Sequence, residues 1–332
     1  MRPKRLALMT LLTLATSWSG PERRPVLGDR PDVEAARVPL DPANPARVRS
    51  GALTYLGGVA LSSSDGAFGG FSSMSVAGDR FTLLSDGGNI VRFRMDGGFR
   101  VSEPWFGDLP AGPGLGWDKS DRDSESMAVD PASGQVWVGF ERANQIWRYA
   151  PGLTAPAASA APPAMAGWMD NGGAESLARL RDGRFLVIAE TDRRHGGAAR
   201  NALIFSGDPV AHPDSGFRFG YLPPAGYDPS DAAELPDGRV LVINRKLAMP
   251  FAWSAVLTLI DPRGFKPGAI VAGREIARFA APLTVDNFEG LAVTREGGAT
   301  ILWMVSDDNL FVLQRTLLMK FRLELATIPP SP

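Results

Sequence analysis

The eight residues Asp-Ser-Glu-Ser-Met-Ala-Val-Asp, at positions 123–130, recur in degenerate form four more times along the chain. The related stretches begin at Phe71, Gly173, Pro229 and Asn287. Aligned on a small-apolar-Ala core, the five positions before that core are separated by 53, 50, 56 and 58 residues and read Ser72, Glu125, Glu175, Asp231 and Glu289. A repeat of this length that carries several strands is typical of a β-propeller or a repeat array.

A β-rich run follows each of these stretches, at residues 81–86, 136–141, 185–190, 240–244 and 301–307. Turn dipeptides such as Asp182-Gly183 and Gly297-Gly298 precede most of the runs and supply the positive φ that tight hairpins need. Four runs end in an acid, namely Asp86, Glu141, Glu190 and Asp307, whereas the remaining one ends in Asn244-Arg245. Antiparallel pairing places both acids of a hairpin at the same end, so we expect them to gather at one mouth of a ring.

The strand pattern predicts a single all-β domain, a β-propeller of five four-stranded blades. The last repeat supplies only three strands, at 290–294, 300–306 and 316–324, and the chain then ends. The early run 53–61 is the natural fourth strand, and it would close the ring and remove exposed edges. In the second repeat, we expect a low-complexity loop over the Ala/Pro-rich residues 151–164 and a weak fourth strand near 165–169. Six blades are the alternative, if a long loop hides one.

The amino-acid composition excludes several classes of function. The 332 residues are 44% hydrophobic and 21% charged, with a net charge of −1. The absence of cysteine excludes disulfides and thiolate chemistry, and two histidines make a His-rich zinc site a poor fit. No basic stripe indicates a nucleic-acid partner. No Gly-x-Ser-x-Gly elbow, P-loop or His-Glu-x-x-His motif is present. We expect a monomer.

The N-terminus carries an export pattern. Met1-Arg-Pro-Lys-Arg5 is followed by mostly apolar residues from Leu6 to Trp18, which predicts a signal peptide, or an uncleaved anchor, over residues 1–20. The Pro-, Arg- and Asp-rich residues 21–50 are expected to be a disordered linker, residues 51–326 the propeller domain, and 327–332 a tail. We therefore expect a periplasmic or secreted protein, with membrane contact only through an uncleaved N-terminal segment.

Converging carboxylates need protons, cations or arginines to coexist, and oxygen donors without His or Cys favour Ca²⁺ or Mg²⁺. The predicted metal-ligand set is Asp86, Glu125, Glu141, Glu175, Glu190, Asp231, Glu289 and Asp307. The alternative is that each acid caps its own blade by accepting backbone N–H bonds. Basic residues adjoin the acids in the sequence, and Arg is suited to bidentate anion binding, which predicts substrate contacts at Arg122, Arg142 and Arg245. Simple charge balance is the alternative for these arginines.

Taken together, these motifs resemble the bacterial family called "esterase-like activity of phytase", or phytase-like domain proteins. The resemblance covers roughly residues 52–325 and rests on Gly69-Gly-Phe-Ser-Ser-Met, Leu84-Ser-Asp-Gly-Gly, Asp123-Ser-Glu-Ser-Met-Ala, Gly139-Phe-Glu-Arg with Ile146-Trp-Arg-Tyr, Gly173-Ala-Glu-Ser-Leu and Asn287-Phe-Glu-Gly-Leu-Ala. It implies a propeller with repeated carboxylates and a hydrolase activity, and it carries over Asp86, Glu125, Glu141, Arg142, Glu175, Glu190 and Glu289. Repeat four departs from the pattern, with Asp231 in place of Glu and Asn244-Arg245 in place of an acid.

Three functions agree with this pattern. The first is an exported hydrolase, assisted by a divalent metal, that acts on a small anionic phosphate ester or other ester, with catalytic roles for Glu125, Glu175 and Glu289. The second is a non-catalytic periplasmic propeller that binds a ligand or protein and holds a structural cation. The third is a Ca²⁺-dependent lactonase. Propeller specificity lies in loops, so the sequence does not name the substrate.

Overall fold

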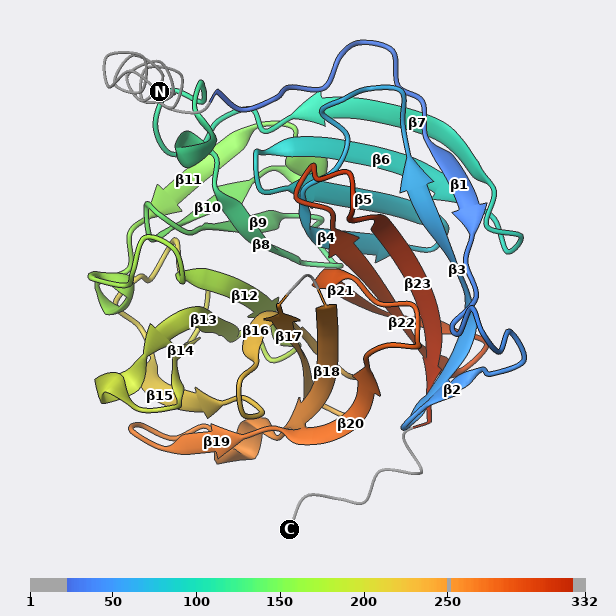
Figure 1. Cartoon of the computed structure of the whole chain (residues 1–332). Coiled ribbons are helices and arrows are strands. Elements are labelled where there is room, and N and C mark those ends of the chain that lie inside the picture. The colour runs from blue at the N-terminus through green and yellow to red at the C-terminus, as the bar shows by residue number, and fades with distance from the viewer. Residues whose placement is uncertain (1–22, 250–251, 325–332) are drawn as a thin grey trace, which may run out of the picture.

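The structure, a computed structural model, describes residues 23–249 and 252–324. Within them, five small sheets stand in a ring as the blades of a β-propeller (Figure 1). The prediction of an all-β propeller with five blades is confirmed, and the six-bladed alternative is not. The predicted signal segment 1–20 and tail 327–332 lie outside the described residues. Across the described ranges, we find no helix of the length and apolar character that a membrane crossing requires.

Each blade is a four-stranded antiparallel sheet whose first strand lies nearest the axis. Blade one consists of β4 (Phe71–Ala77), β5 (Arg80–Ser85), β6 (Asn89–Met95) and β7 (Val101–Asp108). Blade two consists of β8 (Ser124–Val129), β9 (Val136–Phe140), β10 (Gln145–Tyr149) and β11 (Pro156–Ala160). Blade three consists of β12 (Ala174–Arg179), β13 (Phe185–Arg193), β14 (Arg200–Phe205) and β15 (Phe217–Leu222).

Blade four consists of β16 (Asp228–Glu234), β17 (Val240–Ala248), β18 (Ala252–Ile260) and β20 (Arg274–Phe279). Blade five consists of β21 (Asn287–Glu296), β22 (Ala299–Asp307), β23 (Thr316–Leu323) and β3 (Leu53–Ser62). The short strand β19 (Ile270–Ala272) leaves blade four and pairs in parallel with β15, which covers the outer edge of blade three. An unpaired edge would otherwise be open to another chain.

The hydrophobic core is divided into five clusters, and each fills the gap between two neighbouring blades. Strand β9 illustrates how one strand serves two gaps. Val136, Val138 and Phe140 pack toward blade one, whereas Trp137 packs toward blade three against Phe185. Successive side chains of a strand point to opposite faces, so a strand buried on both faces reads as a nearly continuous apolar run.

The N-terminal strand closes the ring as predicted. Strand β3 pairs antiparallel with β23, for example Val59 with Leu318 and Leu61 with Thr316. Blade five is thus built from both ends of the described chain, and the blue and red strands lie side by side in Figure 1. Blade five therefore has its full set of four strands only when β3 is paired with β23.

The expected linker over residues 21–50 is corrected by the structure. Strand β1 (Glu34–Arg37) pairs with β3, and β2 (Arg49–Ser50) forms a hairpin with the start of β3. Leu40 is fully buried in the cluster between blades four and five. The physical reason is that β3 would otherwise be a bare edge, and β1 covers it. The Pro and Arg content that indicated a linker reflects a chain that turns often while it packs on the outer side of the ring.

The fourth strand of blade two also differs from the prediction. It is β11, within the segment expected to be a loop, and residues 165–169 form no strand. Instead Met165 and Trp168 are buried in the cluster between blades two and three. An outer edge strand tolerates Pro156 and small alanines because only one side of it needs backbone partners. The Pro-Ala-Ala-Ser-Ala sequence therefore carries little strand signal of its own.

We predict that Leu40→Ala lowers the free energy of unfolding by about 2–5 kcal/mol, because it leaves a cavity in a core cluster. Leu56→Ala is the matched control, since Leu56 lies close by in the chain but is 40% exposed and should cost less than about 0.5 kcal/mol. Urea unfolding followed by tryptophan fluorescence measures both. Equal, small effects would show that the residues before β3 are not part of the folded unit.

Candidate functional site

All five innermost strands carry a β-bulge at the same level of the ring. In blade two, Ser124 pairs with Phe140 and Ser126 with Gly139, so Glu125 is the extra residue. The extra residues of the five blades, in order, are Ser72, Glu125, Glu175, Ser230 and Glu289. A bulge bends its strand and re-aims a side chain, and it recurs here at each position where the repeat motif begins.

The second strand of each blade ends beside the bulge. In each blade we take the residue that follows the partner of the last residue before the bulge; these residues are Asp86, Glu141, Glu190, Arg245 and Asp307, of which Arg245 and Asp307 are themselves paired, with Asp228 and Asn287. Blades one and four carry serine at the bulge, Ser72 and Ser230, and blade four alone of the five carries a basic residue, Arg245, at the strand end. The ring is built from one repeated backbone geometry, and its charge pattern is set by side chains alone.

The structure brings seven of the eight predicted acids together and leaves Asp231 apart. Asp231 lies one residue beyond the bulge and accepts backbone N–H bonds from Ala232 and from Leu291, both at 2.7 Å. The Leu291 bond joins blade four to blade five. Asp231 is thus an inter-blade link, and the repeat alignment through Asp231 was offset by one residue, because Ser230 and Asp231 are both small polar residues beside the bulge.

Arg245 is the internal counter-ion of the ring. Its guanidinium lies 2.8 Å from Glu190, 3.1 Å from Glu289 and 3.8 Å from Glu175, and it donates to Asn287 Oδ1 at 3.0 Å. These three acids come from the blades on either side of blade four. The surrounding carboxylates raise the pKa of Arg245 above its ordinary value despite the cost of burial. Arg245 therefore already has acidic partners within the protein.

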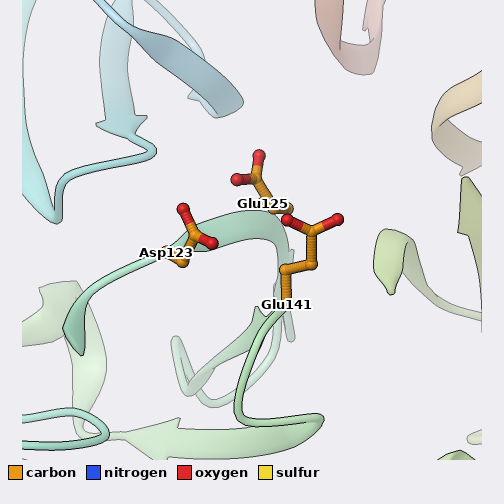
Figure 2. A group of neighbouring side chains, drawn as sticks. All are labelled: Asp123, Glu125 and Glu141. Carbon is orange, nitrogen blue, oxygen red and sulfur yellow. The ribbon is translucent and has the colours of Figure 1, made fainter. Parts of the chain in front are cut away.

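A separate cluster of three carboxylates lies on blade two. Oxygen atoms of Asp123, Glu125 and Glu141 lie within 4.8 Å of one another, and Figure 2 shows the three side chains turned toward a shared space. Glu141 Oε1 accepts N–H bonds from Gly172 and, at 3.1 Å, from Gly173, which fixes the side chain and leaves Oε2 for another ligand. A larger residue at position 173 would be crowded there, because a Cβ would lie 3.1 Å from Glu141 Cγ.

Glu141 also joins this cluster to a second group of acids. One oxygen each from Glu141, Glu175 and Glu190 likewise lie within 4.8 Å of one another. That second group differs from the first, because Arg245 contacts two of its members. The buried counter-ion thus lies on the side of blades three to five, whereas the cations that pair with Asp123 and with the neighbouring Asp86 are the more exposed Arg142 and Lys119.

Burial and mutual repulsion raise the pKa values of these acids. Burial, with the added charges of Asp123 and Glu190, raises the pKa of Glu141 to about 7. Burial also raises the pKa of Glu289 to about 7 against the opposing effect of Arg245. The pKa values of Glu125, Glu175 and Asp307 lie well above the ordinary range for the same two reasons. An all-oxygen, closely spaced and desolvated set of this kind fits a hard divalent cation, whose charge relieves the repulsion.

The match to a known family follows this geometry. Residues 66–310 match the family described as "Phytase-like: Esterase-like activity of phytase". The chain belongs to the phytase-like family. No curated protein sequence matches the chain.

Several solved structures are similar at low identity. The Kuenenia stuttgartiensis hydrazine synthase shares 11% identity over 74% of this chain and 78% of that chain, with a TM-score of 0.39. A chain of the mitotic checkpoint complex shares 10% identity over 81% and 69%, with a TM-score of 0.38. The Dos1 propeller shares 9% identity over 82% and 75%, with a TM-score of 0.37.

Two basic side chains border the blade-two cluster of this phytase-like propeller. Arg142 Nε donates to Asp123 Oδ2 at 2.8 Å, and Lys119 Nζ lies 2.5 Å from Asp86 Oδ2. Both side chains are more than 40% exposed, so they can exchange partners with a ligand. Arg122 is placed elsewhere. It is buried, donates to the Pro113 carbonyl at 2.6 Å, and supports the loop between β7 and β8 instead of reaching the acids.

Sequence reasoning passed over Asp123 and Lys119 as site residues. Asp123 stands two residues before Glu125 in the motif, and alternate residues of a strand share a face, so the spacing was a usable signal for Asp123. Lys119 reaches Asp86 from the short 3₁₀ helix Lys119–Asp121 in the loop between blades one and two. That contact depends on the path of the loop, and the sequence pattern holds no sign of it.

We predict that the melting temperature of the metal-free protein in chelator falls as the pH rises from about 5 to about 8. The folded-state pKa values of Glu141 and Glu289 are about 7, above their ordinary 4.5, so the folded state binds more protons in this interval. The stabilisation is complete below about pH 4.5 and is lost as the pH passes about 7.

Thermal unfolding across this pH range measures the effect. The double variant Glu141→Gln, Glu289→Gln is the control, and its melting temperature should change less with pH because two of the titrating groups are gone. A wild-type melting temperature that stays constant or rises over the same range would contradict the electrostatic description of the ring.

Proposed function

We propose that the chain is an exported, divalent-cation-assisted hydrolase that acts on phosphate esters or other anionic esters at the mouth of the ring. The observation that carries the proposal is the Asp123, Glu125 and Glu141 cluster, three closely spaced carboxylates inside a ring where Arg245 compensates mainly the opposite side. Membership of the phytase-like family supports a hydrolase-like propeller. The basic start and the apolar run before residue 20 support export.

The proposed cation is Ca²⁺ or Mg²⁺, held by Asp123, Glu125 and Glu141. When bound, such an ion polarises an ester oxygen and lowers the pKa of a water molecule. Arg142 and Lys119 hold the anionic part of the substrate, because they border the cluster and are partly exposed. To bind the substrate, Arg142 and Lys119 must weaken their ion pairs with Asp123 and Asp86. A bound cation lowers the free-energy cost of this change, because its positive charge replaces that of the two basic side chains.

Glu175 is the residue best placed to accept a proton. It neighbours Glu141 and Glu190, is buried, and has a pKa well above the ordinary value because of burial and of the surrounding carboxylates. A raised pKa makes the ionised carboxylate a stronger base. Glu289, which the sequence also assigned to catalysis, lies 3.1 Å from Arg245, and in this proposal it holds that guanidinium in place.

We predict that millimolar Ca²⁺ raises the melting temperature, because it binds the folded state. At a Ca²⁺ concentration one hundred times Kd, binding adds about 2.7 kcal/mol to the free energy of unfolding. The double variant Glu125→Gln, Glu141→Gln should abolish the rise, because it removes two of three ligand carboxylates. Asp170→Asn is the control, since Asp170 is an exposed acid on the loop before β12. Identical melting curves of the wild type in chelator and in millimolar Ca²⁺ would count against the cation site.

We further predict different kinetic effects for the basic and acidic residues, once a screen of phosphate esters, carboxyl esters and lactones has given a substrate. Arg142→Ala should raise KM, at a cost of about 1.5–3 kcal/mol for a lost charge-assisted bond, and Arg142→Lys should fall between that variant and wild type. Glu175→Gln should lower kcat with little change in KM.

Steady-state kinetics of the purified protein with Ca²⁺ or Mg²⁺ measures these changes. Activity that is insensitive to changes at Glu125, Glu141 and Glu175 would place the chemistry elsewhere. A folded, cation-binding protein without turnover across the whole screen would favour the alternative of a non-catalytic propeller that holds a structural cation.

A further inference from the structure

Exposed hydrophobic side chains gather on one face of the propeller. We call this face the mouth face, and define it as the side where the second strands end and the first strands begin, which is also the side of the acid ring. In the described part of the chain, fourteen large hydrophobic residues are strongly exposed, and nine of them lie on this face: Leu115, Trp117, Met169, Leu247, Met249, Leu310, Phe311, Val312 and Leu313. Soluble proteins rarely concentrate apolar side chains in this way without a partner.

These residues come from four separate segments around the ring. They lie between β7 and β8, between β11 and β12, near the end of β17, and between β22 and β23. The segments belong to different blades, which Figure 1 shows spread around the axis. A small ligand contacts neighbouring residues in one pocket, whereas a flat partner can touch several separated loop tips at once. The distribution therefore favours an extended, planar partner.

The loop between β22 and β23 is held in a shape that presents its apolar residues. Asp308 accepts bonds from Gly70 N at 2.9 Å, from Leu310 N at 3.1 Å and from Thr316 Oγ1 at 2.9 Å. Val312 at its tip is 91% exposed and Leu313 is 69% exposed. A loop fixed by one carboxylate in this way keeps its apolar tip in solvent, and it gives up little conformational entropy when the tip is buried in a partner.

The position of the N-terminal segment identifies the partner. Arg24 N donates to Trp117 O at 3.3 Å, Arg24 Nη1 donates to Gly87 O at 2.9 Å, and Leu27 N donates to Asn89 Oδ1 at 3.2 Å. The chain thus enters the described structure on the mouth face, beside Trp117. The residues that precede it include the basic start and the mostly apolar run from Leu6 to Trp18. A basic and then apolar sequence at this point would bring the mouth face to a lipid surface.

We propose that the mouth face docks on the surface of a lipid bilayer. The apolar tips at Trp117, Met249 and Val312 enter the interfacial region, and the acid ring faces the lipid headgroups. Trp is favoured at such interfaces because its ring is amphipathic. A consequence, which rests on the proposed function above, is that the substrates are amphiphilic esters presented at a membrane surface.

Quenching of tryptophan fluorescence tests the docking with the full chain. Phosphatidylcholine vesicles with brominated acyl chains should quench the wild-type protein, and Trp117→Phe should lose a clear part of that quenching. Trp105→Phe is the control, because Trp105 is exposed on β7, away from the mouth face, and its replacement should leave the quenching unchanged. Equal quenching of the wild type and Trp117→Phe would overturn the proposal, since contact would then come from the N-terminal segment alone.

Vesicle partition provides the second measurement. The triple variant Leu310→Ser, Val312→Ser, Leu313→Ser should partition into phosphatidylcholine vesicles at least roughly tenfold less than wild type, because three apolar side chains no longer leave water. The control triple variant Val48→Ser, Leu56→Ser, Ile270→Ser removes three exposed hydrophobic residues from other parts of the surface and should partition like wild type.

Two outcomes of this comparison would overturn the proposal. One is equal partition of the two triple variants. The other is a wild-type dimer, seen by analytical ultracentrifugation, that the Leu310, Val312 and Leu313 variant converts to a monomer, because the mouth face would then be an interface between two copies. Neither measurement uses catalysis, so a failure of the proposed hydrolase activity leaves the docking result intact, and the reverse also holds.

Discussion

The pairing of β3 with β23 is the interaction on which the rest of the structure depends. A propeller blade buries both of its faces against neighbours, and each of the five hydrophobic clusters is shared by two blades. If the ring were open, the clusters at the gap would lose half of their lining, and two blades would expose an apolar face. The β1 strand and the buried Leu40 extend this closure to residues before β3, so the part of the chain that reads as a linker helps to complete the fold.

Closure also creates the electrostatic problem at the axis. Three bulge residues and four residues at the ends of second strands are acids, and these seven carboxylates repel one another at the same level of the ring. Three features reduce the repulsion, because Ser72 and Ser230 stand at bulges where the other blades have an acid, and Arg245 of blade four adds a cation. A buried charge is tolerated only with a partner, and Arg245 provides one for Glu175, Glu190 and Glu289 of blades three and five. The acids near blade two are left with Arg142 and Lys119 at the outer side of the ring.

The sequence predicted the fold well where strands are buried on both faces. Runs such as Val136-Trp-Val-Gly-Phe140 have no other reasonable structure, and the three-strand last repeat pointed to closure by β3. The edge strand β11 was missed because Pro156 and its alanines pack little and show no alternation.

The site was predicted less completely. The alignment of the fourth repeat was offset by one residue at the bulge, which hid the structural role of Asp231, whereas the replacement of an acid by Asn244-Arg245 was visible in the sequence. The Lys119 contact depends on a loop path, which periodicity does not encode.

Arg245, which replaces an acid in blade four, makes the charge distribution around the ring asymmetric. A ring with the same acid pair in every blade would repel equally on all sides, and a cation would have no preferred position on the axis. Arg245, which is largely buried, contacts Glu175, Glu190 and Glu289, whereas Asp123 and Asp86 pair with the partly exposed Arg142 and Lys119, so the counter-ions nearest to solvent lie beside Asp123, Glu125 and Glu141. The exposed cations Arg142 and Lys119 lie on that same side, next to loops that carry Leu115 and Trp117. Carboxylates, partly exposed basic side chains and apolar loop tips thus coincide in one sector, where a ligand with an anionic head and an apolar part would find complementary groups.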